Sequence, residues 1–173
     1  MKLESQTFSQ YTRYGFIIAL LAISLTSSVS VLAGEYFDKD DQEGLKHLSG
    51  ALMAWYAVNQ LGQPKSEKDM EKVFSLLGRV YSECKQVPDT TLKKVDTEFA
   101  SQLRENLQVG VRQYESGLRA YWEASKKGNK PTAKAKSDMN SGQQKMVRFH
   151  RYYNANIERI VRNLKSKGVD IFG

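Results

Sequence analysis

The stretch 92–121, LKKVDTEFASQLRENLQVGVRQYESGLRAY, decides the fold, because its apolar residues recur with the period of an α-helix. A mean step of about 3.6 residues places them on one face of a straight helix of about eight turns. No alternating strand pattern competes with this period. The recurring positions are Leu92, Val95, Phe99, Leu103, Leu107, Val111, Tyr114, Leu118 and Tyr121.

The three prolines, Pro64, Pro88 and Pro131, divide the remaining chain into segments with the same helical period. We predict shorter helices over about 41–61 and 66–87, with Ser66 as the N-cap of the second and Asp69 at its capping-box position. The last helix is predicted to end near residue 167, with Gly168 as its stop. The predicted fold class is therefore an all-α helical bundle.

The predicted helices differ in length, so a bundle of four equal helices does not follow. We expect a long antiparallel helix hairpin over about 90–167, with the two shorter helices packed along one end. The alternative is that the long helices break, with Ser141-Gly142 as the expected point in the last one. Gly110 and Gly117 lie beside the apolar face and suit either a kink or the close approach of a neighbouring helix.

An apolar segment, GFIIALLAISLTSSVSVLA (15–33), precedes these helices. Arg13 lies before it, and small residues lie at Val31 and Ala33, a pattern typical of a signal peptide cleaved before Gly34. The alternative is an uncleaved membrane anchor, because residues 16–33 are just long enough to span a bilayer. We predict two parts of the chain, 1–33 as signal or anchor and 34–173 as one exported helical domain.

Both alternatives export the domain, because the positive charge precedes the apolar segment and acids follow it. The single cysteine, Cys84, cannot form an internal disulfide, and no Asn-x-Ser/Thr acceptor occurs. We therefore expect a bacterial periplasmic protein, soluble after cleavage near Ala33, or alternatively one anchored in the inner membrane with its domain in the periplasm.

The formal charge of +7 is concentrated in the second half of the chain. Residues 34–88 hold 7 basic and 9 acidic side chains, whereas residues 89–173 hold 17 and 9. The densest cluster is the segment SKKGNKPTAKAKS (125–137), which has no acid between Glu123 and Asp138. We predict that it contacts a partner or an anionic surface, although such runs also occur simply as solvated loops. The residues of this candidate site are Lys126, Lys127, Lys130, Lys134, Lys136 and Trp122.

The sequence offers weaker candidates for a cofactor or metal. His47 follows Glu43 by one helical turn, but the further ligands that a metal needs are not evident. His150 could hold haem together with a methionine of another helix, but methionine at helical spacing is ordinarily core. Cys84 lies on an apolar face and is expected to be a small buried hydrophobe. We therefore expect no cofactor.

No nucleophile elbow, His-Glu-x-x-His pattern, phosphate-binding glycine loop or paired-cysteine motif occurs, so we predict that the chain is not an enzyme. The expected function is a non-enzymatic binding, chaperone-like or assembly component of the cell envelope. The expected partners are an envelope protein, an anionic membrane surface or both, with possible homo-oligomers and no nucleic acid. The alternative is a periplasmic helical bundle that binds haem, a metal or another ligand.

Overall fold

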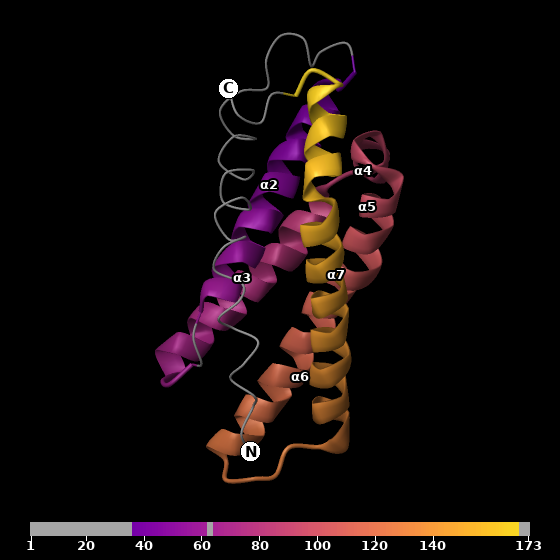
Figure 1. The fold of residues 1–173 in the computed structure, drawn as a ribbon. Helices are drawn as coiled ribbons and strands as arrows, with labels where there is room; N and C mark the ends of the chain where they lie inside the picture. The colour runs from indigo at the N-terminus through magenta and orange to yellow at the C-terminus, as the bar shows by residue number, and fades with distance from the viewer. Residues whose placement is uncertain (1–35, 62–63, 170–173) are drawn as a thin grey trace.

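The fold is built from helices, and no strand occurs in the part of the chain that is described. The computed structural model describes residues 36–61 and 64–169. In chain order these residues form α2 (Lys39–Gln60), α3 (Glu67–Gln86), α4 (Asp89–Val95), α5 (Thr97–Gln102), the π-helical segment η2 (Leu103–Gln108), α6 (Val109–Lys126) and α7 (Ala133–Lys165) (Figure 1). The all-α prediction is confirmed, whereas the predicted signal or anchor segment lies outside the described residues.

The two shorter helices begin at capping boxes. In α3 the Ser66 hydroxyl accepts from the Asp69 backbone N–H at 3.1 Å, and the Asp69 carboxylate accepts from the Ser66 backbone N–H at 3.0 Å. The predicted capping box of this helix is therefore confirmed. Asp38 and Asp41 form the same reciprocal pair at the start of α2, which begins two residues before the predicted boundary.

The long helix predicted from about residue 90 is interrupted at Asp96. This residue has an extended backbone, with φ −170° and ψ 128°, and separates α4 from α5. Its carboxylate accepts from the Phe99 backbone N–H at 2.8 Å and from the Asn163 side-chain amide at 3.1 Å. Asp96 therefore serves as the N-cap of α5, and the continuous helix runs from α5 through η2 to the end of α6, over about 45 Å.

The π-helical segment η2 places Arg104 against the end of α3. The guanidinium donates to the carbonyl oxygens of Cys84 and Val87 and to the Asp89 carboxylate. The last carbonyls of a helix have no partner within it, and a cation there also complements the helix dipole. Arg104 is therefore the C-terminal cap of α3, supplied from a distant helix.

The helix α7 is continuous through Ser141-Gly142, with 33 residues and a length of about 50 Å. It forms an antiparallel hairpin with α6, and glycines lie where the two backbones approach. A Cβ on Gly142 would lie 2.6 Å from the Gly110 carbonyl oxygen, and one on Gly117 would lie 2.6 Å from the Ala135 carbonyl oxygen. The expected close approach is confirmed. The helix ends at Lys165, and Gly168, the predicted stop, turns the chain three residues later with a φ of +79°.

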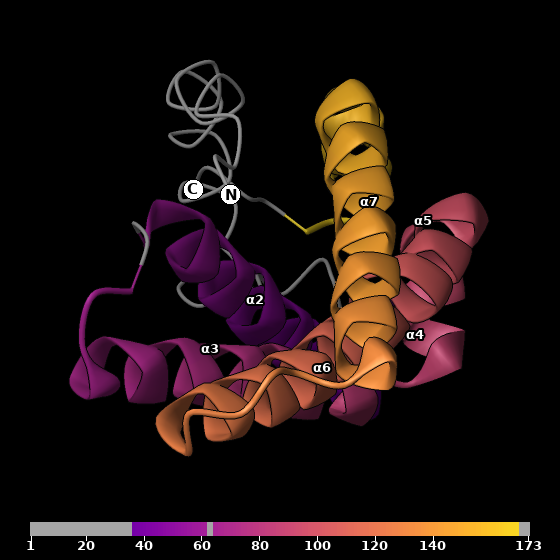
Figure 2. The same cartoon turned by 90° about the horizontal axis from the view of Figure 1, so that it is seen from below.

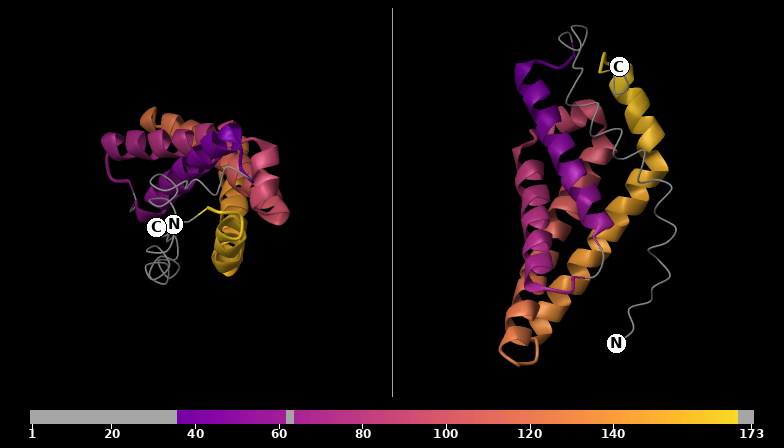
Figure 3. Two further views of the ribbon diagram at one scale, coloured as in Figure 1. Left: turned by 90° about the horizontal axis from the view of Figure 1, so that it is seen from above. Right: turned by 90° about the vertical axis from the view of Figure 1, so that its left-hand side faces the viewer.

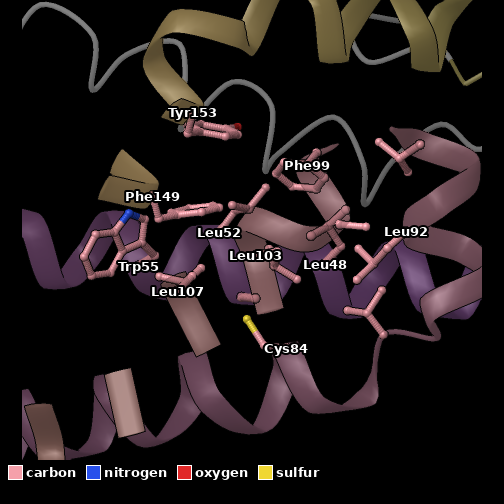
Figure 4. Packing of buried hydrophobic residues seen from close by; sticks show 14 of the residues in the cluster. Leu48, Leu52, Trp55, Cys84, Leu92, Phe99, Leu103, Leu107, Phe149 and Tyr153 are labelled. Atoms are coloured by element: carbon pink, nitrogen blue, oxygen red, sulfur yellow. The ribbon is translucent and has the colours of Figure 1, made fainter. Parts of the chain in front are cut away.

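The hydrophobic core lies where α2, α3, α4, α5, η2 and the second half of α7 meet (Figure 4). Phe99, Phe149 and Tyr153 are at most 1 % exposed, and their ring centroids are 5.8–6.3 Å apart. Four large apolar residues of α2 lie in the same core; they are Leu45, Leu48, Leu52 and Trp55.

The second hairpin, α2 and α3, packs against the first through α3 and α6. Figure 2 and the right-hand view of Figure 3 show α3 alongside α6. The Arg119 guanidinium lies 4.2 Å from the centre of the Phe74 ring, and Lys126 pairs with Glu67 farther along. The α6–α7 turn therefore extends to the far end of the molecule, beside the N-terminus of α3.

Candidate functional site

The turn between α6 and α7 has a defined backbone. Gly128 adopts φ +68°, and the Asn129 backbone N–H donates to the Ala124 carbonyl at 2.8 Å, so the last carbonyls of α6 are satisfied. The Thr132 hydroxyl accepts from the Ala135 backbone N–H at 3.1 Å and caps α7. The chain from Lys126 to Lys136 is therefore held between two capped helix ends.

Two of the five predicted lysines have acidic partners. Lys126 pairs with Glu67 at the start of α3, and this hydrogen bond raises the pKa of the ammonium group. Lys134 pairs with Asp138 one turn along α7, at 2.6 Å. Both pairs are exposed, and exposed pairs contribute about 0–1 kcal/mol to stability. Their charges are partly compensated within the chain.

The other three predicted lysines are uncompensated. Lys127, Lys130 and Lys136 are exposed, and none of them forms an ion pair with a residue in 36–61 or 64–169. A positive potential therefore remains at the tip of the hairpin, and it is screened beyond about 8 Å at physiological ionic strength. This arrangement can hold an anionic group by charge and hydrogen bonding.

The aromatic residues beside the turn are only partly buried. Trp122 is half-buried and Tyr121 is 37 % exposed, so Tyr121 lies outside the core although it continues the apolar period of the sequence. Aromatic side chains with one face in water are common at membrane and protein interfaces. The structure therefore leaves Trp122 available as a partial contact beside the lysines.

His47 is paired with a carboxylate of the neighbouring helix. Its Nδ1 lies 2.8 Å from Glu83 Oε2, whereas the Glu43 carboxylate considered in the sequence lies 4.0 Å from Nε2. Within the described ranges no group of three or more potential ligands is arranged to hold a metal ion. The half-buried His47 instead links α2 to α3.

His150 lies half-buried on α7, and its Nε2 is 3.0 Å from the Asn154 side-chain amide nitrogen. Burial lowers the pKa of the imidazole. Of the methionines considered as haem partners, Met146 and Met70 are buried and Met53 is 39 % exposed. Met146 lies one turn before His150 on the same helix, so it cannot supply the opposite axial ligand to one haem held between helices.

Cys84 is fully buried in the core, as predicted, and burial raises the pKa of its thiol to about 12. The thiolate is the reactive form of cysteine, so this residue is inert in the folded chain.

A polar cluster that the sequence did not indicate ties α2 to α4. The Asp41 carboxylate is buried and accepts from the Thr91 hydroxyl at 2.6 Å and from the Lys94 ammonium group. Burial raises the pKa of Asp41, but these hydrogen bonds lower it by more, so the net shift is downward. All three polar groups satisfy one another, which makes this a structural cluster rather than a binding site.

No helix in the described part of the chain combines the length and the hydropathy that crossing a bilayer requires. Comparison of the sequence and the structure with protein-family models, curated proteins and solved structures gives no match.

Proposed function

We propose that this chain is a non-enzymatic binding or assembly component of the bacterial cell envelope, exported to the periplasm or anchored in the inner membrane with its helical domain outside. The domain contacts an anionic surface through the tip of the α6–α7 hairpin. The observation that supports the proposal is a group of three exposed lysines that have no acidic partner among the described residues, on a turn held by two capped helix ends. They are Lys127, Lys130 and Lys136.

The position of the turn favours contact over catalysis. The large buried side chains of the core lie toward the opposite end of the hairpin, so the tip can meet a partner without disturbing the core. Exposed lysines on long side chains adapt to surfaces of anionic groups, and each contributes roughly 1 kcal/mol near an anionic membrane. The predicted signal or anchor segment, residues 1–33, is the reason for placing the domain in the periplasm in this proposal.

The test is a triple variant in which Lys127, Lys130 and Lys136 are replaced by Gln. Its far-UV circular dichroism should match that of the native chain, because the three side chains are exposed and lack acidic partners. Its retention on envelope membranes recovered from the producing cell should fall by about a hundredfold, as three lost cationic contacts imply.

A matched control replaces three exposed lysines of α3, Lys68, Lys72 and Lys85, by Gln and produces the same change in net charge. Equal retention of the two variants would mean that overall charge, not the turn, governs binding. Intact-mass analysis of the recovered protein would show whether the chain starts at Gly34; recovery from the cytosol would contradict the export part of the proposal.

A further inference from the structure

The outward face of α7 carries a row of cations that the turn does not include. Arg148, Arg151, Arg162 and Lys165 are all exposed. We call this row the basic stripe; Glu158 is the one exposed acid on the same face. In all, α7 contains eight basic and two acidic side chains, so most of the net charge of the chain lies on this helix.

Helical geometry places the stripe on one line. Arg151 and Arg162 are eleven residues apart, close to three full turns, and Arg148 precedes Arg151 by three. The buried residues of α7, among them Phe149, Tyr153 and Ile160, lie on the opposite side of the helix. The stripe from Arg148 to Lys165 is therefore about 25 Å long and faces away from the other helices. The left-hand view of Figure 3 shows α7 at the edge of the bundle.

The next feature of the stripe is the set of interactions that its three arginines make. Arg148, Arg151 and Arg162 form no ion pair or side-chain hydrogen bond with any described residue, in contrast to Arg159 on the inner flank of α7, which bonds Glu98 and the Tyr152 hydroxyl. A guanidinium group matches two phosphate oxygens with two parallel N–H bonds, so arginine suits phosphate better than lysine does. The three arginines of the stripe therefore present phosphate-binding groups that have no partner among residues 36–61 and 64–169.

The shape of the stripe and the side chains beside it favour one class of anionic partner over the others. A convex helix meets a flat surface along a line, and mobile headgroups of a bilayer can gather beneath each arginine. Val147 is the one large apolar side chain exposed on α7, so the stripe has no aromatic anchor of the kind that dominates protein interfaces. It also has no exposed aromatic ring on which the bases of a single-stranded nucleic acid would stack.

We infer that the basic stripe of α7 is a docking surface for the phosphate headgroups of an anionic lipid bilayer, with the helix lying flat on the membrane. This inference rests on the proposed function and names its anionic surface. Because the apolar face of α7 is buried in the core, contact is by charge alone and does not require insertion.

The test measures binding of the full chain to vesicles of phosphatidylcholine alone and of phosphatidylcholine mixed with phosphatidylglycerol. The apolar segment 16–33, where present, contributes to both vesicle types, so the ratio of the two binding constants reports the contribution of charge. We expect the ratio to fall by about a hundredfold when Arg148, Arg151 and Arg162 are replaced by Gln, at about fivefold per charge. The control with Lys68, Lys72 and Lys85 replaced by Gln should keep the native ratio.

The outcomes separate this inference from the proposed function. If the ratio of binding constants falls in the variant of Lys127, Lys130 and Lys136 but stays at the native value in the arginine variant, the turn binds the membrane and the stripe inference is overturned. If the native chain binds both vesicle types equally but retains an envelope protein through the lysines of the turn, the lipid inference is overturned and the proposed function stands. A native ratio near one without any such retention overturns both.

Orientation gives a second readout. A fluorophore on Ala155→Cys, an exposed position four residues after Arg151, should be quenched by a headgroup-borne nitroxide in the anionic vesicles. The same fluorophore on Ser75→Cys, exposed on α3, should be quenched much less. The buried Cys84 stays unlabelled in the folded chain. Equal quenching at the two positions would overturn the flat orientation of α7.

Discussion

Replacing Gly142 by Ala should force α6 and α7 apart. The added Cβ would lie 2.6 Å from the Gly110 carbonyl oxygen and 2.7 Å from the Tyr114 Cα. Ordinary contacts between such atoms are about 3.5–4.0 Å long, so α7 must move locally by about 1 Å. The Tyr114 backbone nitrogen lies nearer still, and all three obstructing atoms belong to the α6 backbone, so no change of side-chain rotamer can relieve the contact.

The magnitude follows from two opposing effects. Overpacking a site of this kind costs about 1–3 kcal/mol, because neighbouring contacts such as those of the buried Met146 are stretched as the helices separate. Alanine in place of glycine within a helix returns up to ~1 kcal/mol through its higher helix propensity. We therefore expect the free energy of unfolding to fall by about 1–2 kcal/mol.

Gly78→Ala is the matched control. Gly78 lies within α3, and no heavy atom lies within 4 Å of the position that its Cβ would occupy. This variant should gain about 0.5–1 kcal/mol, since only helix propensity changes. Urea unfolding followed by far-UV circular dichroism measures both variants, and similar slopes would show that the unfolded states are comparable. If Gly142→Ala proves as stable as Gly78→Ala, the close backbone contact between α6 and α7 does not exist.

Two further predictions concern the polar contacts that the structure revealed. Asp41→Asn removes the charge that Lys94 and Thr91 stabilise and should cost about 2 kcal/mol at neutral pH. Because the pKa of Asp41 is lowered in the folded chain, the stabilisation that its carboxylate provides is complete above about pH 4 and is lost as the pH falls further. The free energy of unfolding of Asp41→Asn should therefore decrease less between neutral and acid pH than that of the native chain. An equal decrease in both proteins would contradict the role given to Asp41. Arg104→Gln should lower the free energy of unfolding by about 2 kcal/mol, because it removes the cap of α3. The control Arg112→Gln removes one exposed contact to Tyr81 and should change the free energy of unfolding by less than ~0.5 kcal/mol in the same urea assay.

The sequence predicted the helices well wherever a local signal accompanied the apolar period. Ser66 and Asp69 mark the start of α3, and Gly168 marks the end of α7, because caps depend on residues a few positions apart. The interruption at Asp96 was missed because Val95 and Phe99 are both buried, so the apolar pattern runs through the break. The overlooked signal was Asp96 itself, an acceptable N-cap within the sequence VDTE.

Other features could not be read from the sequence because they depend on residues far apart in it. Arg104 caps α3 from a π-helical turn, and a hydropathy period near 3.6 does not distinguish this turn from an ordinary helix. The same limit applies to the lysines of the turn. Lys126 resembled Lys127 and Lys130 in the sequence, and only the fold shows that it pairs with Glu67 of α3. Lys134 differs, because its partner Asp138 lies four residues on in the same helix and this pair could have been read from the sequence.

The packing of the distal half of the α6–α7 hairpin explains why its tip can carry the basic turn. Between residues 112 and 145 the buried positions are Gly117, Ala135 and Gly142, so this region is held by close backbone approach rather than by large side chains. A contact made through glycine and alanine occupies a narrow part of each helix circumference. The remaining circumference of α7 is open to solvent and accepts charge at little cost to stability. Charges on the turn can therefore change with the partner, whereas the glycines that hold the hairpin cannot.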